Sequence, residues 1–173
     1  MYTHGGGADR AASRHRWPAI HVNRLRPVPI LYAACAAALA STVIELLLWP
    51  LAGDDALRNL LRDARLTAAI ALGRTALRSS AGFDPTIMGV ATLVHAALSL
   101  AYAAMLAALV RNLSRGAALC AGAVFGLVLY GVNLYAFTAV FPWFAQVRGA
   151  ITLVAHLVFG ASAAGVYCAL RRR

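Results

Sequence analysis

The sequence predicts an all-α integral membrane protein, with four transmembrane helices and one amphipathic helix between the first and second of them. Three observations lead to this prediction: the composition, the lengths of the apolar runs and the placement of the arginines. Of the 173 residues, 61% are hydrophobic and only 13% are charged, and the mean hydropathy is +0.70. Soluble domains carry roughly a quarter charged residues, so the composition places the chain in the membrane class.

Four apolar runs are long enough to cross a bilayer, since a helix needs about 20 residues to span a ~30 Å hydrocarbon core. The first run contains "AAALAS", which resembles a signal-peptidase site, but its apolar stretch continues well beyond it and predicts an uncleaved anchor. We expect the four helices to form one membrane domain over 28–173, a four-helix bundle. The predicted spans are 28–51, 87–110, 117–141 and 150–170.

The basic residues predict how the chain is oriented. All 16 are arginines, and ten of them lie in the N-terminal tail, between the second and third spans, or at the C-terminus. Positive charge gathers on the cytoplasmic side of membrane proteins, so we expect both termini in the cytoplasm, with 1–27 as a basic cytoplasmic tail. Trp49 and Trp143 would then lie at the outer membrane interface. The arginines stand in short blocks between apolar runs and no nucleic-acid-binding motif is present, so nucleic acid is not an expected partner.

The segment 53–85 is not a span, because arginines interrupt its apolar part. Arg58, Arg62 and Arg65 fall on one stripe of a helix, and Asp54 or Asp55 can cap that helix at its N-terminus. We expect a break near Gly73. The segment is interpreted as an amphipathic element on the outer membrane surface, and a re-entrant hairpin is the alternative.

Each predicted span contains one strongly polar side chain, and the four lie at similar depth. Counted at 1.5 Å per residue, Glu45, His95, Asn133 and His156 lie roughly 9 to 12 Å from the outer ends of their helices. Ionisable groups at such depth are costly in lipid, so we expect all four to face a common interior. His95 and His156 should be close enough to share a partner, directly or through one water.

Neighbouring polar residues extend this candidate site. Ser99 and Tyr102 share a helix face with His95, and Tyr130 shares one with Asn133. Small residues lie on the same stripes, including the glycines of the "GAVFG" motif at 122–126, and small residues mark the side on which membrane helices pack. The candidate ligand-binding set is therefore Glu45, His95, Asn133, His156, Ser99, Tyr102 and Tyr130.

Three interpretations of this polar layer remain open. Its members can simply hydrogen-bond one another and hold the bundle together, which would make a structural or assembly protein. They can bind a proton, an ion or a small ligand, or couple to a partner. Two histidines and a carboxylate can also ligate a metal or haem in an electron-transfer subunit. We expect no metal, cofactor or catalytic residue and no enzyme, because no nucleophile–base pair or cofactor fingerprint is present. The expected partners are the lipid bilayer and a second copy or another membrane protein.

Two similar phrases suggest an internal repeat. "TLVHAALSL" at 92–100 and "TLVAHLVFG" at 152–160 each place a histidine after nearly the same residues. The chain is then interpreted as a doubled two-helix unit, in which Glu45 corresponds to Asn133. Such a parallel repeat would be related by an axis along the membrane normal.

Several stretches also carry a family resemblance. "RNLLRDARLTAAIALG", "FDPTIMGVATLVHAALSLAYA", "LYGVNLYAFTAVFPWFA" and "HLVFG" resemble a group of small, uncharacterised bacterial inner-membrane proteins. Some of these carry a sodium/proline-symporter label, and they are distantly similar to the YagU-type proteins. The resemblance covers about 30–170 and implies an inner-membrane location, but no activity. Symporters of that type use long repeats with broken helices, so only a homo-oligomer of this chain would enclose a comparable pathway.

Overall fold

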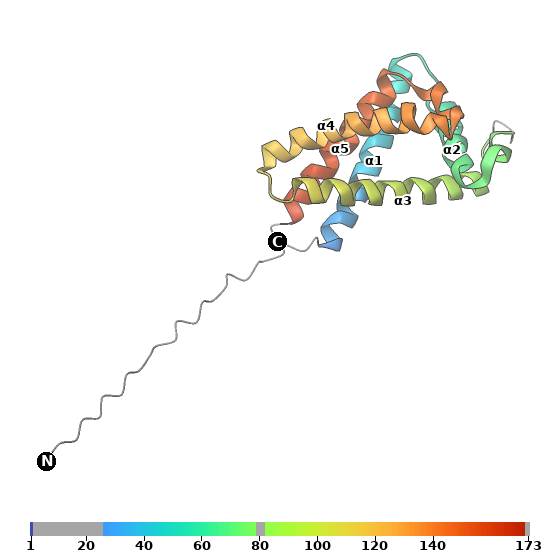
Figure 1. The fold of residues 1–173 in the computed structure, drawn as a ribbon. Coiled ribbons are helices and arrows are strands. Elements are labelled where there is room, and N and C mark those ends of the chain that lie inside the picture. The colour runs from blue at the N-terminus through green and yellow to red at the C-terminus, as the bar shows by residue number, and fades with distance from the viewer. Residues whose placement is uncertain (2–25, 79–81, 172–173) are drawn as a thin grey trace.

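The computed structural model describes Met1 and residues 26–78 and 82–171, so the predicted basic tail lies almost entirely outside the described residues. The described chain is helical (Figure 1). Short 3-10 and π segments, η1 to η4, cover Gly73–Arg78, Val132–Ala136, Phe137–Ala139 and Pro142–Val147. The α-helices are α1 (Pro27–Leu51), α2 (Ala56–Leu72), α3 (Pro85–Val110), α4 (Arg115–Gly131) and α5 (Ala150–Leu170).

Four helical segments of the described chain are long and apolar enough to cross a membrane, as predicted, and their bounds lie within two residues of the predicted ones. They are α1, α3, α5 and the continuous segment Arg115–Ala139, which joins α4 to η2 and η3. Large apolar side chains on their outer faces are exposed, for example Leu39 (67%) and Leu93 (72%). Such a surface is suited to lipid and not to water. The chain is therefore a small integral membrane protein with an all-α fold.

Both ends of the four-span unit lie together. Figure 1 shows the start of α1, the end of α5 and the α3–α4 connection at one end of the bundle. The guanidinium of Arg171 donates hydrogen bonds there to the backbone carbonyls of Val110 and Leu113. We name this the termini end and the opposite one the α2 end. Helix α1 therefore begins at the same end of the bundle at which α5 ends.

Helices α4 and α5 cross at glycines, which allow their backbones to touch. A Cβ atom added to Gly122 would lie 2.7 Å from the Cβ of Ala164. One added to Gly126 would overlap the carbonyl oxygen of His156, and one added to Gly160 would overlap that of Gly122. The small residues predicted to face inward therefore form the closest helix contact of the described chain.

The helices do not pack as two equivalent pairs. Helix α5 is central and packs extensively on both α4 and α1, whereas α3 makes few contacts with α4. In a doubled two-helix unit, α1 and α3 would meet as α4 and α5 do. No glycine crossing like that of α4 and α5 joins α1 and α3, so the packing does not reproduce the proposed repeat.

Helix α2 covers the α2 end of the bundle. The Asp55 carboxylate caps it by accepting a hydrogen bond from the Arg58 backbone N–H at 2.9 Å. It ends at Leu72, and Gly73 follows with a φ of +70°, so the predicted cap and break are confirmed. In Figure 1, α2 runs crosswise to α3. Its small side chains pack against the first turns of α3; the buried residues in this cluster are Ala64, Ala68, Ala69, Ala76, Ile87 and Ala91.

The two tryptophans near this end do not behave alike. Trp49 is 4% exposed and lines a cavity inside the bundle, so its indole is covered by protein; that it lies at the level of the outer membrane interface stays a prediction. Trp143 is partly exposed, and its indole N–H donates to the backbone carbonyl of Leu66 at 3.0 Å. It therefore holds η4 against α2.

Candidate functional site

A cavity of about 1010 Å³ lies among all five α-helices and is bounded at the α2 end by α2. Six of the seven predicted site residues line it: Glu45, His95, Ser99, Tyr102, Asn133 and His156. Its other polar lining residues are Ser41, Thr42, Asp63, Thr67, Thr92 and Thr152. The remaining wall is apolar, as is usual for small-molecule sites with a few converging polar groups.

One part of the site is a chain of hydrogen bonds that joins three helical segments. The Tyr102 hydroxyl donates to the side-chain oxygen of Asn133 at 2.7 Å. The Asn133 side-chain nitrogen lies 3.4 Å from Nε2 of His156, and Nδ1 of His156 lies 2.7 Å from the backbone carbonyl of Thr152. A carbonyl can only accept, so Nδ1 carries the proton and Nε2 accepts from the amide. Both ring nitrogens of His156 thus have a polar neighbour.

Asn133 stands in a π-helical turn, Val132–Ala136, at the end of α4. The wider turn inserts one extra residue into the helix, and such turns are frequent at functional sites. It breaks the regular helix that the sequence predicts up to Phe141. No feature of the local sequence signals this turn.

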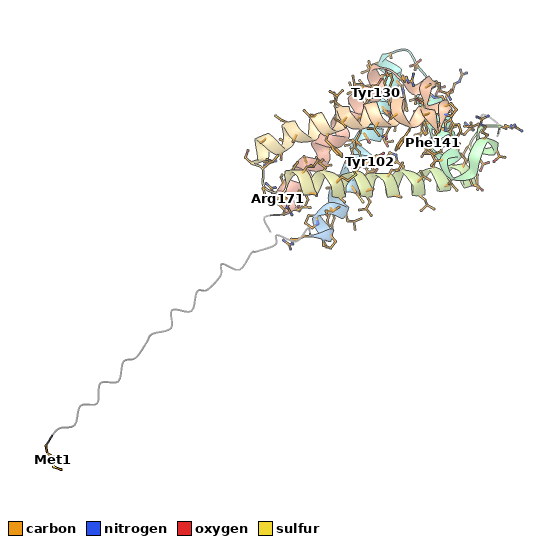
Figure 2. All side chains as sticks on the ribbon, in the orientation of Figure 1. Met1, Tyr102, Tyr130, Phe141 and Arg171 are labelled. Carbon is orange, nitrogen blue, oxygen red and sulfur yellow. The ribbon has the colours of Figure 1, made fainter. Side chains whose placement is uncertain are left out.

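Tyr130 lies beside the cavity and not on its wall. Its ring meets that of His156 edge to face, with centroids 5.7 Å apart, and its hydroxyl accepts from the Gly149 backbone N–H at 3.2 Å. Tyr130 therefore packs against His156 from outside the cavity lining, and its hydrogen bond links α4 to the start of α5. On the cavity side, the Tyr102 ring meets the ring of Phe159 at 6.4 Å. Figure 2 labels the two tyrosines, on α3 and α4.

Glu45 and His95 differ from the linked residues. Glu45 is half-buried and His95 is exposed on the cavity wall, and within the described part of the chain neither has a hydrogen bond or an ion pair. His95 lies within electrostatic range of His156, although no direct contact joins the two rings. The predicted layer thus divides into a linked set, Tyr102–Asn133–His156, and an open pair, Glu45 and His95.

Asp63 on α2 is a cavity residue that the sequence did not single out. Its Oδ1 lies 2.7 Å from Nε of Arg62, and both residues lie within electrostatic range of Glu45. Burial raises the pKa of the Asp63 carboxyl above its usual value, and the hydrogen bond from Arg62 opposes this shift. In the sequence, the only signal for Asp63 as a cavity residue is the composition of α2. That composition does not show that α2 folds over the bundle.

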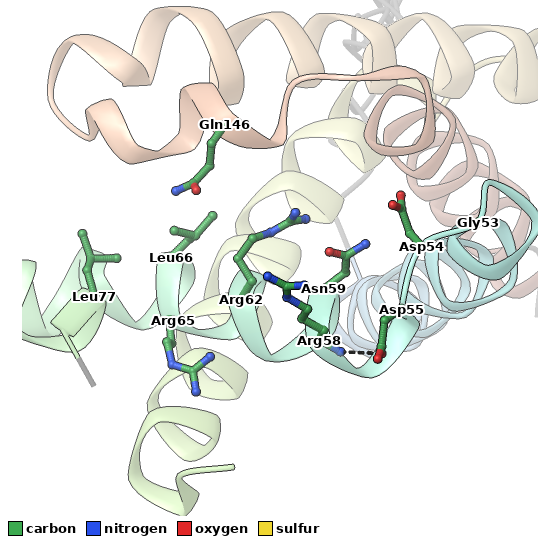
Figure 3. A pocket seen from close by; sticks show the side chains of 10 residues that line it. All are labelled: Gly53, Asp54, Asp55, Arg58, Asn59, Arg62, Arg65, Leu66, Leu77 and Gln146. Carbon is green, nitrogen blue, oxygen red and sulfur yellow. Dashed lines mark hydrogen bonds between the residues drawn. The ribbon is translucent and has the colours of Figure 1, made fainter. Parts of the chain in front are cut away.

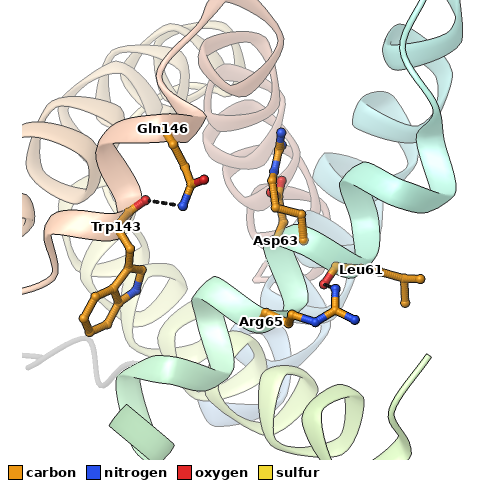
Figure 4. A network of polar contacts seen from close by, with 6 residues as sticks. Leu61, Asp63, Arg65, Trp143 and Gln146 are labelled. Carbon is orange, nitrogen blue, oxygen red and sulfur yellow. Dashed lines mark hydrogen bonds and ion pairs between the residues drawn. The ribbon is translucent and has the colours of Figure 1, made fainter. Parts of the chain in front are cut away.

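The predicted arginine stripe lines a second, polar pocket of about 760 Å³ on the outer side of α2 (Figure 3). Its lining residues are Gly53, Asp54, Asp55, Arg58, Asn59, Arg62, Arg65, Leu66, Leu77 and Gln146. Leu66 lines both pockets, and the Arg62–Asp63 pair bridges them, since Arg62 lines the outer one and Asp63 the inner one. Figure 4 shows Gln146 donating to the Trp143 carbonyl at 2.9 Å. Arg65 donates to the carbonyls of Leu61 and Gly82.

Metal-ligating side chains do not converge in the described ranges. No group of three or more His, Cys, Asp and Glu residues there could hold a metal ion. The cysteines are dispersed, with Cys35 and Cys120 exposed and Cys168 buried. Of the cavity histidines, His156 belongs to the linked set and His95 to the open pair.

Comparison of the chain with protein-family models, curated proteins and solved structures finds no match. The resemblance to small bacterial inner-membrane proteins therefore stays a prediction. The fold itself establishes a small multi-pass integral membrane protein with polar side chains around a cavity inside its bundle.

Proposed function

We propose that this chain is a non-enzymatic membrane protein that binds a small molecule in the cavity of its bundle. The observation that supports this best is the open pair. Glu45 and His95 lie on the cavity wall and form no hydrogen bond or ion pair with the described residues. The neighbouring polar groups Tyr102, Asn133 and His156 are joined by hydrogen bonds. If the polar layer only held the helices together, Glu45 and His95 would be hydrogen-bonded to other helices.

The cost of such groups in a membrane supports the same conclusion. An ionisable side chain at this depth costs at least ~2.5 kcal/mol when it faces lipid alone. Polar groups in the hydrocarbon region therefore need a hydrogen-bonding partner. A bound molecule with its own polar group supplies one to Glu45 and His95. The linked set holds Tyr102 and His156 in fixed positions beside it, as a preorganised site requires.

The arrangement does not favour catalysis. Both ring nitrogens of His156 are engaged, by Asn133 and by the Thr152 carbonyl, so this ring is not available as a general base. The Ser41 hydroxyl donates to the Ala38 carbonyl and is not paired with a histidine. Binding without covalent chemistry is the simpler use of this site.

A pair of neighbouring substitutions tests the proposal. Thr42 lines the cavity, and Val43, the next residue, is 51% exposed on the lipid side. Thr42→Phe should fill part of the cavity, and Val43→Phe should not. The proteins would be extracted with their surrounding lipid, and the small molecules they retain would be identified by mass spectrometry. A molecule retained by the wild type and Val43→Phe but lost from Thr42→Phe supports binding, and identical sets from all three contradict it.

We also propose that the α2 end faces outward from the cytoplasm of a bacterial cell. The arginine distribution in the sequence supports this, because ten of the 16 arginines precede the first predicted span, lie between the second and third, or follow the fourth. In this orientation α2 lies over the outer ends of the spans, with its arginine-lined pocket facing the outer surface.

A further inference from the structure

Along α1 and α5, the cavity lining changes from polar to apolar towards the termini end. Along α1, its lining changes from Ser41, Thr42 and Glu45 near the α2 end to Leu31, Ala34, Cys35, Ala38 and Leu39 towards the termini end. At 1.5 Å per residue, Leu31 and Glu45 are about 21 Å apart along the helix. Helix α5 repeats this gradient, with Thr152 and His156 followed by Phe159. A compact polar solute would leave most of this length unoccupied, whereas a molecule with an apolar chain matches it.

The apolar half opens sideways. Its lining residues include side chains that are largely exposed: Leu31 (54%) and Leu39 (67%) on α1, and Leu100 (43%) on α3. Cys35, between the two leucines of α1, is exposed as well. The opening therefore lies between α1 and α3, within the apolar part of the spans. A molecule dissolved in the bilayer reaches the cavity there without crossing water.

The charges around the polar half select the head group. Two carboxylates, Glu45 and Asp63, line the cavity, and no arginine does, because Arg62 lies on the outer side of α2. A phosphate or carboxylate head would meet these acidic groups, and Arg62, the arginine beside them, is already paired with Asp63. A charged head would also pay the desolvation cost of entering the membrane interior. An uncharged head that donates and accepts hydrogen bonds fits Glu45, His95 and Ser99.

We infer that the ligand is an uncharged long-chain lipid with a hydroxyl or carbonyl head, which reaches the cavity sideways from the bilayer between α1 and α3. This inference rests on the proposed function and names its ligand class and route. The head lies at the polar layer, and the chain runs along α1 towards Leu31. Ordinary anionic membrane lipids are excluded by the same carboxylates that bind the head.

The test uses a long-chain alcohol with a photoreactive diazirine at the end of its chain, added to the full-length protein in phosphatidylcholine vesicles. After illumination, labelled residues are identified by mass spectrometry. Labelling of 31–39 should be saturable, and a tenfold excess of unlabelled alcohol should lower it about tenfold by competition for one site. A fatty acid of the same chain length should not compete. The exposed residues Val124, Leu127 and Val128 on α4, outside the cavity lining, serve as the internal control and should label without saturation.

Two matched variants test where the ligand binds. Ala96 and Ala101 are both exposed on α3, but only Ala96 lines the cavity. Ala96→Phe should abolish the saturable labelling and Ala101→Phe should retain it. Labelling of 31–39 that is no more saturable than that of α4, or that survives in both variants, overturns the inference.

The remaining outcomes separate the inference from the proposed function. If the fatty acid competes as well as the alcohol, the head-group class is wrong, although the cavity still binds a ligand. If the double variant Glu45→Gln, His95→Leu binds the alcohol as tightly as the wild type, the polar layer is not the head-group site and the inference fails, whereas the proposed function fails only if Thr42→Phe retains the same small molecules as the wild type. The inference predicts that this double variant binds the alcohol at least tenfold more weakly.

Discussion

Replacing Gly160 by alanine is expected to push α4 and α5 apart, because the space for a Cβ atom is already filled by backbone. The added carbon would overlap the carbonyl oxygen of Gly122 and lie 2.9 Å from the backbone nitrogen of Gly126. Backbone atoms inside two packed helices cannot rotate away as a side chain can. The helices must therefore separate, or α5 must shift along its axis.

The size of the effect follows from two opposing contributions. Overpacking of a well-packed interior costs about 1 to 3 kcal/mol, and the higher helix propensity of alanine returns up to about 1 kcal/mol. We expect Gly160→Ala to lower the free energy of unfolding by about 1 to 2 kcal/mol. Gly165 is the matched control on the same helix, since its added Cβ would meet only the flexible end of Leu119, at 3.3 Å. Gly165→Ala should leave the stability unchanged or raise it slightly.

The assay is unfolding in mixed micelles by increasing dodecyl sulfate, followed by circular dichroism. A separation of α4 from α5 would also lengthen the contact between Asn133 and His156, which is already 3.4 Å. Gly160→Ala should therefore bind the ligand of the cavity more weakly than Gly165→Ala does. Equal stability of the two variants would refute the account of the glycine crossing.

Three further predictions concern the α2 end. Asp55→Ala removes the cap of α2 and should lower the free energy of unfolding by about 1 kcal/mol. Asp54→Ala removes no cap and should lower it little. Equal losses would contradict the assignment of the cap. Burial holds the pKa of Asp63 above its usual value of 3.8, so its stabilising contribution is complete below pH 3.8 and is lost as the pH rises through the raised pKa. Unfolding of wild type and Asp63→Asn across this range should show the loss in the wild type alone, and parallel pH profiles would argue against it. Reporter fusions after Pro27, after Ser114 and at the C-terminus should report cytoplasm, and one at Thr75 should report the outside; a cytoplasmic Thr75 signal would contradict the orientation.

The spans could be predicted because they depend on a property that the sequence states directly, the length of an apolar run. The cap at Asp55 and the break at Gly73 could be predicted for a similar reason, since both depend on the local chemistry of one residue. The "GAVFG" motif was visible too. Gly160 could be placed on an inward-facing stripe, but its pairing with this motif could not be predicted, because a motif on one helix does not specify which helix it meets.

The candidate site could be predicted only in part. Depth counting assembled Glu45, His95, Asn133 and His156 from four separate helices, and all four line one cavity. Their division into a linked set and an open pair depends on the π-helical turn at Asn133, which no local preference signals. Asp63 was missed because its place in the cavity is set by how α2 folds over the bundle, which is a tertiary property.

The central claim is that Glu45 and His95 face one shared cavity inside the bundle, and cross-linking tests it most directly. In a background with all three native cysteines replaced by alanine, Glu45→Cys would be combined either with His95→Cys or with Leu93→Cys. Leu93 lies on the same helix as His95 but is 72% exposed and does not line the cavity. A short, lipid-soluble bis-maleimide, whose two ends each add one cysteine thiol, should link the His95 pair and leave the Leu93 pair unlinked. Efficient linking of the Leu93 pair without linking of the His95 pair would contradict the shared cavity.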